Sequence, residues 1–493
     1  MFYKSTRNAQ PATATAAEVI KQGLAADGGL FVPDSIPALS LSEIEALCRE
    51  SYPVRAATIL SKFLTDYTYE ELLEDCTAAY DERSFVGGAA PLCNIHDGFE
   101  SLELWHGPTA AFKDMALQIM PRLLSRALVK TGEKRTALIL VATSGDTGKA
   151  ALEGYKDIPG IKIMVFYPVD GVSRVQKLQM ATQTGSNVNV CAIRGNFDDA
   201  QSGVKEIFGD AAMAEALNEK GYFFSSANSI NWGRLAPQIV YYVSAYCDLI
   251  NAGKCKLGES FNISVPTGNF GNIFAAYLAK LMGLPIGHMV CASNTNNILT
   301  DFLRTGTYDR NREFYLTMSP SMDILISSNL ERLLYFTAGS EKTAAYMNAL
   351  KKDGAYTVDA EILAEIRKNF SGYFTTEEET AQTIRETFDR YGYLADTHTA
   401  VAIHAAEEYV RESGDLRPMV IDSTASPYKF ANDVYRAVSG TEAENELAAL
   451  EQLSEKTGTA IPYPLAGLAS RRVNFEGVID RTEMAKAVLD YIG

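Results

Sequence analysis

The feature that most constrains the fold of this chain is a recurring pattern of short apolar segments, each followed by a turn and a helical pattern. The clearest examples are residues 137–142, 162–168 and 261–266. Further segments of the same kind are residues 188–195, 222–227, 288–293 and 419–424. Short apolar strands that alternate with helices are typical of βαβ units, in which a parallel sheet is covered on both faces. We therefore expect an α/β fold that binds its ligands at the carboxyl ends of the strands.

Two stretches depart from this pattern. Residues 1–85 combine helical patterns with polar turns, and a flexible glycine-containing break follows them. Within this stretch Ser42 and Glu45 have the spacing of a capping box, which predicts a helix over residues 43–50. Residues 329–395 are charged and mostly helical in pattern, with weak strand signals, so we expect an inserted helical region or a lid there.

Composition narrows the class of function. The chain has 493 residues, of which 47% are hydrophobic and 22% charged, as in ordinary globular proteins. Its net charge of −16 disfavours non-specific binding to nucleic acid or to an anionic membrane. No segment has the pattern of a signal peptide or a membrane span. We therefore expect a cytoplasmic enzyme of small molecules, with neither nucleic acid nor membrane as a partner.

Cysteine and histidine usage points the same way. The seven cysteines are scattered, and no C-x-x-C pair occurs. Such a set favours free thiols in a reducing compartment. The five histidines show no metal-binding spacing, so we expect no metal site.

Two glycine-rich turns follow predicted strands. The first is TSGDTG (143–148), whose hydroxyl and N–H groups could bind an anion at a helix N-terminus. It is not a Walker A loop, because Thr143 and Ala150 stand where that loop requires Gly and Ser or Thr. The second is PTGNFGN (266–272), where glycine lets the backbone approach a ligand and N–H groups converge on a phosphate. Each could instead be a plain strand-to-helix turn, but two such turns favour a phosphorylated ligand.

A single lysine, Lys113, follows a run of small and apolar residues and opens a helical pattern. A partly desolvated lysine has a lowered pKa and is a nucleophilic amine suited to a Schiff base. By spacing alone, a surface lysine beside Asp114 is the commoner alternative.

Residues 225–234 form a further polar segment. Asn228, Ser229 and Arg234 offer neutral donors and one cation near a helix start, and the arginine fork suits phosphate. Helix capping by Asn or Ser, with a surface arginine, explains the same residues equally well.

Together and in this order, the motifs resemble those of the threonine synthases, pyridoxal-phosphate (PLP) enzymes of fold type II, in their longer microbial and fungal class. The likeness covers nearly the whole chain. It rests on YKSTR (3–7), GLAADGGLFVP (23–33), HGPTAAFKD (106–114), ATSGDTG (142–148), NFDDAQ (196–201), NSINWGR (228–234), PTGNFGN (266–272), SPSMDILISSNLER (319–332), DTHTAV (396–401) and DSTASPYKF (422–430). The resemblance implies a tryptophan synthase β-like fold, with parallel-sheet domains covered by helices and an extra N-terminal region.

The resemblance also places the residues that bind the cofactor. The family's Schiff-base lysine falls on Lys113. Thr424 supplies a hydroxyl at the pyridine nitrogen, with Asp422 as the competing candidate. The loop that binds the PLP phosphate comprises Gly268, Asn269, Phe270, Gly271 and Asn272.

The substrate residues follow from two other motifs. The resemblance implies that the motif at 142–148 binds the carboxylate or phosphate of the substrate through Thr143, Ser144, Asp146 and Thr147. It also implies that the motif at 228–234 binds the substrate phosphate through Asn228, Ser229 and Arg234.

This chain departs from the family pattern at three places. Ser426 stands where His or Asn is usual, Asn272 where Asp is usual, and Asp396-Thr397 where Cys-Pro usually precedes the His-Thr-Ala-Val motif. We expect these changes to bear on fine substrate contacts. His106 and His398 are expected to be structural rather than catalytic.

The implied activity is that of a carbon–oxygen lyase acting on phosphates, threonine synthase. It converts O-phospho-L-homoserine and water to L-threonine and phosphate by γ-elimination and β-addition, the last step of threonine biosynthesis. The alternatives are another fold type II lyase, such as a phospholyase or a threonine or serine dehydratase, and a non-catalytic PLP-binding homologue. A monomer or a homodimer is expected.

We expect three regions along the chain. Residues 1–90 form the N-terminal region of the family. Residues 91–260 carry the Schiff-base lysine and the small domain. Residues 261–493 supply the large-domain part, with the phosphate loop, the helical insertion and a C-terminal region.

Overall fold

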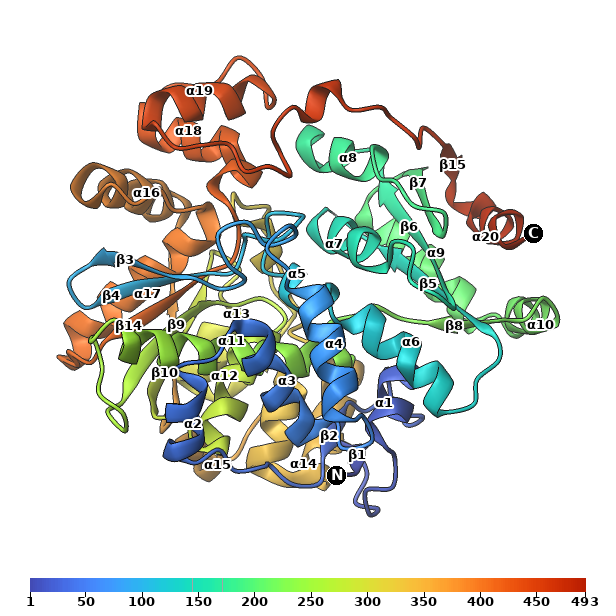
Figure 1. Cartoon of the computed structure of the whole chain (residues 1–493), viewed down its shortest axis with the longest axis horizontal. Coiled ribbons are helices and arrows are strands. Elements are labelled where there is room, and N and C mark those ends of the chain that lie inside the picture. Colours follow the sequence, from blue (N-terminus) through green and yellow to red (C-terminus); the bar gives the residue numbers. More distant parts are fainter. Residues whose placement is uncertain (144, 171) are drawn as a thin grey trace.

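The computed structural model describes residues 1–143, 145–170 and 172–493, and the chain folds around two main β-sheets (Figure 1). The larger sheet has six strands in the order β13, β10, β9, β14, β4 and β3. In that order their bounds are Phe370–Phe374, Ile286–Ser293, Phe261–Pro266, Met419–Ser423, Phe99–Glu103 and Leu92–His96. Neighbouring strands run parallel except at one edge, where β3 and β4 are antiparallel.

The smaller sheet has five parallel strands in the order β15, β7, β6, β5 and β8. Their bounds are Val478–Asp480, Val188–Arg194, Ile161–Pro168, Thr136–Ala142 and Tyr222–Ser225. In Figure 1 the two sheets lie on opposite sides of the molecule. Two-stranded antiparallel pairs complete the strands: β1 (Tyr3–Ser5) with β2 (Phe31–Pro33), and β11 (Thr307–Asp309) with β12 (Ala355–Thr357).

Every apolar segment that the sequence predicts to be a strand forms one, and the expected α/β class is confirmed. All residues of β9 and β14 are buried. Their side chains are apolar along most of their length because helices cover both faces of a parallel sheet.

Helices surround both sheets (Figure 1). Those that precede β8 along the chain are α1 (Ala16–Gln22), α2 (Leu41–Leu47), α3 (Tyr52–Phe63), α4 (Tyr69–Ala79), α5 (Asp114–Leu117), α6 (Met120–Lys130), α7 (Asp146–Tyr155), α8 (Arg174–Ala181), α9 (Phe197–Gly209) and α10 (Ala211–Glu219). The later ones are α11 (Trp232–Asn251), α12 (Gly271–Met282), α13 (Ile298–Thr305), α14 (Leu330–Asp353), α15 (Ala360–Arg367), α16 (Glu377–Tyr391), α17 (Thr397–Ser413), α18 (Ala431–Ser439), α19 (Ala448–Thr457) and α20 (Met484–Ile492). Among the described residues, no helix combines the length and apolar character that crossing a membrane requires.

The predicted cap at the start of the second helix is wrong by two residues. Ser40, not Ser42, caps α2, and Glu43 completes the capping box with it. Both serines have a glutamate three residues later, so the box alone cannot choose between them. Leu39 and Ile44 decide the register, because both are buried at the positions of a hydrophobic staple around a cap at Ser40.

The region 329–395 is mostly helical, as expected, but it also contributes the strands β12 and β13, which the sequence analysis missed. Strand β13 pairs with β10 at the edge of the larger sheet. Its central residue, Gly372, packs against α13, where an added Cβ would lie 2.8 Å from the Cα of Thr300. A short edge strand with a glycine at its centre has little of the apolar signal by which buried strands are found.

Distant parts of the chain meet in both sheets. Strand β4 pairs with β14, and the C-terminal segment returns to the smaller sheet, where β15 pairs with β7 (Figure 1). The expected boundaries at residues 90 and 260 stay predictions, and any spatial domain must combine segments from both sides of the second boundary.

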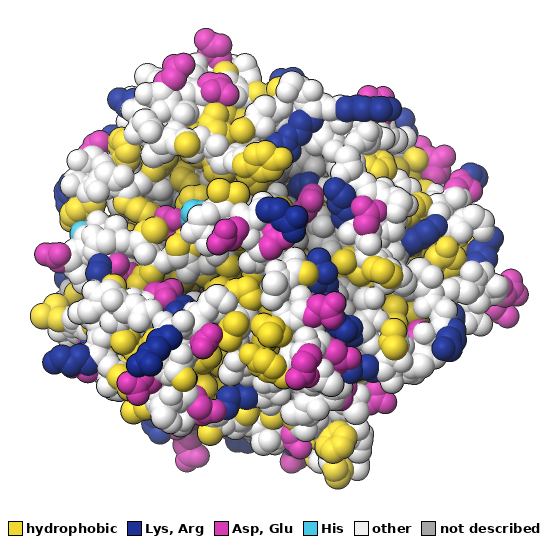
Figure 2. Space-filling view, in the orientation of Figure 1, with side chains coloured by type: hydrophobic (Ala, Val, Ile, Leu, Met, Phe, Trp, Pro, Cys, Tyr) yellow, Lys and Arg dark blue, Asp and Glu magenta, His cyan; other side chains and the backbone are white. Residues whose placement is uncertain are grey.

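On the face shown in Figure 2, Lys and Arg side chains are interspersed with Asp and Glu and form no continuous basic area.

Candidate active site

Lys113 lies at the start of α5, against the end of strand β14. The segment that leads to Lys113 runs beside the residues that follow the strand. Ala111 and Ala425 form an antiparallel bridge, and the N–H of Phe112 donates to the carbonyl oxygen of Thr424 over 2.8 Å. Lys113 therefore lies at the carboxyl edge of the larger sheet, where ligands of such folds bind.

The Lys113 amine is buried among polar groups from three other segments. Its Nζ lies 3.3 Å from Ser321 Oγ and 3.8 Å from Asp146 Oδ2, and the side chain is only 11% exposed. Burial lowers the pKa of this amine, and nearby Arg234 acts in the same direction, while Asp146 opposes them. Lys113 is therefore the desolvated lysine of the first interpretation and not a surface residue.

Asp114, the neighbour that the alternative interpretation pairs with Lys113, instead bonds to Thr109. One carboxyl oxygen accepts from the Thr109 N–H over 2.8 Å and the other from its hydroxyl over 2.7 Å. Burial raises the pKa of Asp114 to about 7, although these hydrogen bonds oppose the rise.

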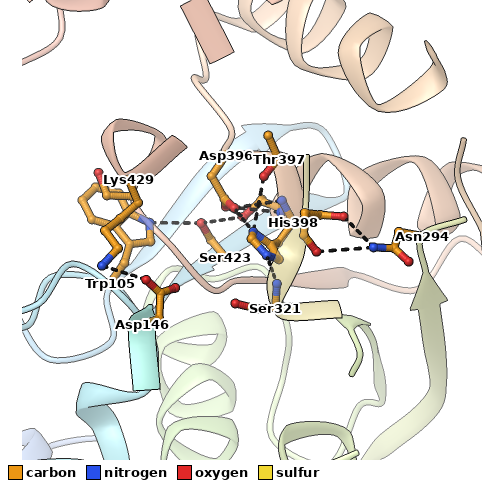
Figure 3. Close-up of polar contacts among 12 residues, drawn as sticks. Trp105, Asp146, Asn294, Ser321, Asp396, Thr397, His398, Ser423 and Lys429 are labelled. Carbon is orange, nitrogen blue, oxygen red and sulfur yellow. Dashed lines mark hydrogen bonds and ion pairs between the residues drawn. The ribbon is translucent and has the colours of Figure 1, made fainter. Parts of the chain in front are cut away.

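An ion pair that the sequence analysis missed joins the loops of the two sheets. Lys429, which follows β14, places Nζ 2.8 Å from Oδ1 of Asp146 at the start of α7 (Figure 3). Lys429 Nζ also donates to Gln179 Oε1 over 2.9 Å and to the Thr109 carbonyl over 3.2 Å. Burial alone would raise the pKa of Asp146, but Lys429 and Lys113 outweigh it and hold this carboxylate well below its usual range.

The turn at residues 143–148 uses much of its polarity internally. The Thr143 hydroxyl accepts from the N–H groups of Gly145 and Gly148 over 3.0 Å each. Thr147 is half-buried, and Ser144 lies outside the described residues. Of the residues predicted to bind substrate here that the structure describes, Asp146 has its side chain beside Lys113.

The loop from Gly268 to Asn272 connects β9 to the N-terminus of α12. Within the part of the chain that the structure describes, the five backbone N–H groups of this loop donate to no other group. Phe270 is fully buried and adopts a left-handed conformation with φ of 63°. The Asn272 side chain bonds within the loop, donating to the Pro266 carbonyl over 3.3 Å and accepting from the Ile273 N–H over 3.0 Å. Free N–H groups at a helix N-terminus are suited to binding an anion.

The segment from Ser319 to Arg332, to which the sequence analysis assigned no role, ties this loop to its surroundings. Ser321 lies beside Lys113, and its carbonyl oxygen would be 2.6 Å from a Cβ added at Gly268. The Ser327 hydroxyl donates to the Gly268 carbonyl over 2.6 Å. Asn329 donates to the carbonyls of Asn269 over 3.0 Å and of Ser229 over 3.4 Å. The segment is one of the motifs on which the family resemblance rests, and this resemblance was the signal that could have identified it.

Arg234 is buried in the first turn of α11. It donates from Nη1 to the Ala227 carbonyl over 2.8 Å, while its buried Nε lacks a partner among the described residues. Burial lowers the pKa of this guanidinium to about 10, with Tyr155 acting in the opposite direction. It is therefore not the surface arginine of the alternative interpretation.

The other two residues of that motif lie nearer the surface. Asn228 is exposed, and its side-chain oxygen accepts from the Ser229 hydroxyl over 3.3 Å. Neither caps α11, because Asn231 does so by accepting from the Gly233 N–H.

Thr424 and Asp422, the two candidates for the pyridine nitrogen, lie in different surroundings. Thr424 is buried just beyond β14, next to the segment that carries Lys113. Asp422 lies within β14, where its Oδ2 is 2.6 Å from the Tyr242 hydroxyl and its Oδ1 is buried without a partner in the described chain.

His398 bonds to the backbone of Ser321 (Figure 3). Its Nδ1 lies 2.9 Å from Asp396 Oδ1, and its Nε2 lies 3.1 Å from the backbone N of Ser321. Asp396 also caps α17 by accepting from two backbone N–H groups. His106 bonds to Glu103 Oε2 over 2.7 Å and to the Val86 carbonyl over 3.0 Å.

Comparisons with known proteins match these motifs along the chain. The model of the threonine synthase N terminus matches residues 2–80, that of the pyridoxal-phosphate dependent enzymes residues 102–421, and that of the threonine synthase C-terminal region residues 399–481. The fold resembles the crystal structure of threonine synthase from yeast, with a TM-score of 0.90 and 33% identity, over 100% of this chain and 98% of that one. It also resembles PLP-bound threonine synthase from Brucella melitensis, with a TM-score of 0.88 and 37% identity over the same shares.

Curated relatives agree. Threonine synthase of Pseudomonas aeruginosa is 40% identical over 474 residues, which are 94% of this chain and 97% of the relative. Human threonine synthase-like 1 is 39% identical over 85% of this chain, and the match spans 58% of that longer protein. These similarities confirm the expected fold type, and the chain belongs to the threonine synthase family of pyridoxal-phosphate-dependent enzymes.

Proposed function

We propose that this protein is a threonine synthase, which converts O-phospho-L-homoserine and water to L-threonine and phosphate and completes threonine biosynthesis. The observation that carries the proposal is the position of Ser321. It contacts the buried amine of Lys113 and packs against Gly268 in the loop of free N–H groups. An amine and an anion site joined in this way suit a phosphorylated aldehyde. The chain is also 40% identical to a threonine synthase over 474 residues.

The donor groups of the site fit PLP. The N–H groups of residues 268–272, at the N-terminus of α12, would hold its phosphate. Lys113, with its lowered pKa, would bind its aldehyde carbon, and the Thr424 hydroxyl would face the ring nitrogen. When bound, PLP supplies a conjugated ring that accepts the electrons left behind when a proton leaves the substrate.

Cations around Lys113 favour an anionic substrate. Arg234 and Lys429 are close enough to Lys113 to lower its pKa. Among the described residues the Nε of Arg234 has no partner and can donate to a phosphate oxygen, and Asn228 and Ser229 lie just before the same helix. We assign these three residues of the 228–234 motif to the substrate phosphate, and Thr143, Ser144 and Thr147 to its carboxylate or phosphate.

Asp146 takes a different place in this proposal. An ionised carboxylate only accepts hydrogen bonds, and a carboxylate or a fully ionised phosphate has no proton to donate to it. Asp146 is held ionised by Lys429 and Lys113, so it can accept hydrogen bonds from donor groups of the substrate, and its predicted part in binding the substrate carboxylate or phosphate stays a prediction. We assign it also to fixing the two lysines.

Lys113 is the residue that moves protons. Its neutral amine removes a proton from the substrate carbons, and the Ser321 hydroxyl, 3.3 Å away, keeps Nζ directed into the site. The loops of both sheets enclose this amine, so one domain is proposed to close over the site and exclude water until the addition step.

A product assay tests the proposal. The PLP-loaded protein is incubated with O-phospho-L-homoserine, and phosphate, threonine and 2-oxobutyrate are measured together. Equal amounts of threonine and phosphate are expected, and Lys113→Ala should abolish both, while Lys352→Ala on the surface should not.

Other products would identify the alternatives. Phosphate and 2-oxobutyrate without threonine would make the protein a phospholyase and contradict the synthase proposal. Protein that binds PLP but releases no phosphate would indicate a different substrate or a non-catalytic homologue.

We further propose that the enzyme works in the cytoplasm as a monomer or homodimer. All seven cysteines are free, which suits a reducing compartment. Cell fractionation and the mass of the purified holoenzyme in solution test the two statements.

A further inference from the structure

Among the described residues, no cation acts on the buried acid Asp422, which is bonded to a tyrosine that also contacts the phosphate loop. Its side chain is fully buried in β14, and Oδ2 lies 2.6 Å from the hydroxyl oxygen of Tyr242 on α11. The same hydroxyl lies 3.0 Å from the carbonyl oxygen of Asn272, the last residue of the loop. The three groups thus form a chain of close contacts from the larger sheet to the N-terminus of α12.

The number of protons in this chain is decisive. A tyrosine hydroxyl has one proton to donate, whereas an ionised carboxylate and a carbonyl can only accept. With Asp422 ionised, either the 2.6 Å contact or the 3.0 Å contact would set two acceptors against each other. Both contacts are hydrogen bonds only when Asp422 carries a proton, donates it to Tyr242, and Tyr242 donates to the Asn272 carbonyl.

The surroundings of Asp422 agree with a neutral acid. The titratable groups that face it are Tyr242 and Tyr241, both on α11. Burial raises the pKa of Asp422 to about 8, although the bond to Tyr242 opposes the rise. The equally buried Asp146 is the useful contrast, because Lys429 and Lys113 keep that carboxylate charged.

We propose that Asp422 is a protonated positioning residue, which holds the Asn272 carbonyl through Tyr242 and so orients the loop N–H groups toward the phosphate of the cofactor. The identity of that phosphate rests on the proposed function. The arrangement also leaves the pyridine nitrogen to Thr424, since Oδ2 of Asp422 is engaged and its Oδ1 is enclosed by protein.

Infrared spectroscopy of the apoprotein tests the proton directly. The difference spectrum between the wild type and Asp422→Asn at neutral pH should contain the C=O band of a protonated carboxylic acid. That band should disappear from the wild type as the pH rises past about 8. A carboxylate band in its place at neutral pH would overturn the proposal.

Binding of PLP and of pyridoxal, which lacks the phosphate, tests the positioning role. Tyr242→Phe removes both hydrogen bonds and should weaken PLP binding on the order of tenfold, with pyridoxal binding unchanged. Asp422→Asn can still donate to Tyr242 and should bind PLP as the wild type does. Tyr246→Phe, on the same helix but bonded to the carbonyls of Lys256 and Glu259, is the matched control.

Equal weakening of both compounds in Tyr242→Phe, or a loss in Asp422→Asn as large as in Tyr242→Phe, would contradict the positioning role. Should Tyr242→Phe fail to fold, PLP affinity against pH decides instead. Above about pH 8 the PLP affinity of the wild type should fall relative to that of Asp422→Asn. Parallel profiles of PLP affinity against pH for the two proteins would contradict the proposed chain of hydrogen bonds from Asp422 through Tyr242 to Asn272. All of these measurements omit the amino-acid substrate, so a missing threonine product would overturn the proposed function alone.

Discussion

The Nε2 of His398 accepts a hydrogen bond from the backbone N–H of Ser321, over 3.1 Å. Because Nε2 is the acceptor, the proton of the neutral ring is on Nδ1, which donates to Asp396 Oδ1 over 2.9 Å. This fixed ring orientation holds Ser321 where its hydroxyl meets Lys113 Nζ. Asp396 thus supplies the carboxylate that orients the histidine.

His398→Ala should therefore change the surroundings of the Lys113 amine, although the effect passes through Ser321. Loss of the acceptor leaves the Ser321 N–H unsatisfied, which costs about 1–3 kcal/mol and displaces the turn. The absorbance of the PLP-loaded protein should then titrate at a shifted pH, and kcat should fall more than KM rises. His398→Gln restores an acceptor near the position of Nε2 and should recover most of the change. Identical titration curves for His398→Ala and wild type would contradict this role.

Lys429→Met should destabilise the protein, because it leaves Asp146 buried without its 2.8 Å partner. Breaking a buried ion pair from one side costs about 3–5 kcal/mol. Denaturant unfolding of the variant should reveal the loss. The matched control is Lys342→Met, which breaks the exposed pair with Asp359 and should leave the unfolding midpoint unchanged. Equal midpoints for Lys429→Met and wild type would show that the pair adds nothing.

Asp114 should make stability depend on pH. Its pKa rises from 3.8 to about 7 on folding, so the native state binds a proton that the unfolded state has released. The resulting stabilisation is complete below about pH 4 and is lost as the pH rises through about 7. Asp114→Asn keeps polar contacts to Thr109 and should reduce this slope in urea unfolding. If the unfolding free energy of Asp114→Asn depends on pH as steeply as that of the wild type, Asp114 is already ionised at low pH in the native protein.

Gly268→Ala should weaken PLP binding. The added Cβ would lie 2.6 Å from the Ser321 carbonyl oxygen, which is backbone and cannot move aside cheaply. Either the phosphate loop or the Ser321 turn must then shift. Gly209→Ala, in the last turn of α9 with open space around it, is the control and should gain up to about 1 kcal/mol of stability. Equal PLP affinity in Gly268→Ala and wild type would show that the loop tolerates the shift.

The sequence alone predicted the main strands and the glycine loop, whereas Lys113 was identified only through its family motif, because its spacing favoured a surface lysine. Buried parallel strands are nearly continuous apolar runs, and the loop and Lys113 lie within short motifs, so local sequence contains these features. Where two local signals competed, as at Ser40 and Ser42, packing of Leu39 and Ile44 decided between them.

Only the tertiary structure decided how charge is arranged around Lys113. Asp146 and Lys429 are 283 positions apart in the chain, and nothing local to either indicates that they pair. The same holds for His398 with Ser321 and for Asp422 with Tyr242. The protonation state of a buried group depends on which charges and donors surround it in space. Asp146 and Asp422 are therefore the same residue type in the sequence, but folding makes one a charged partner of lysines and the other a neutral acid.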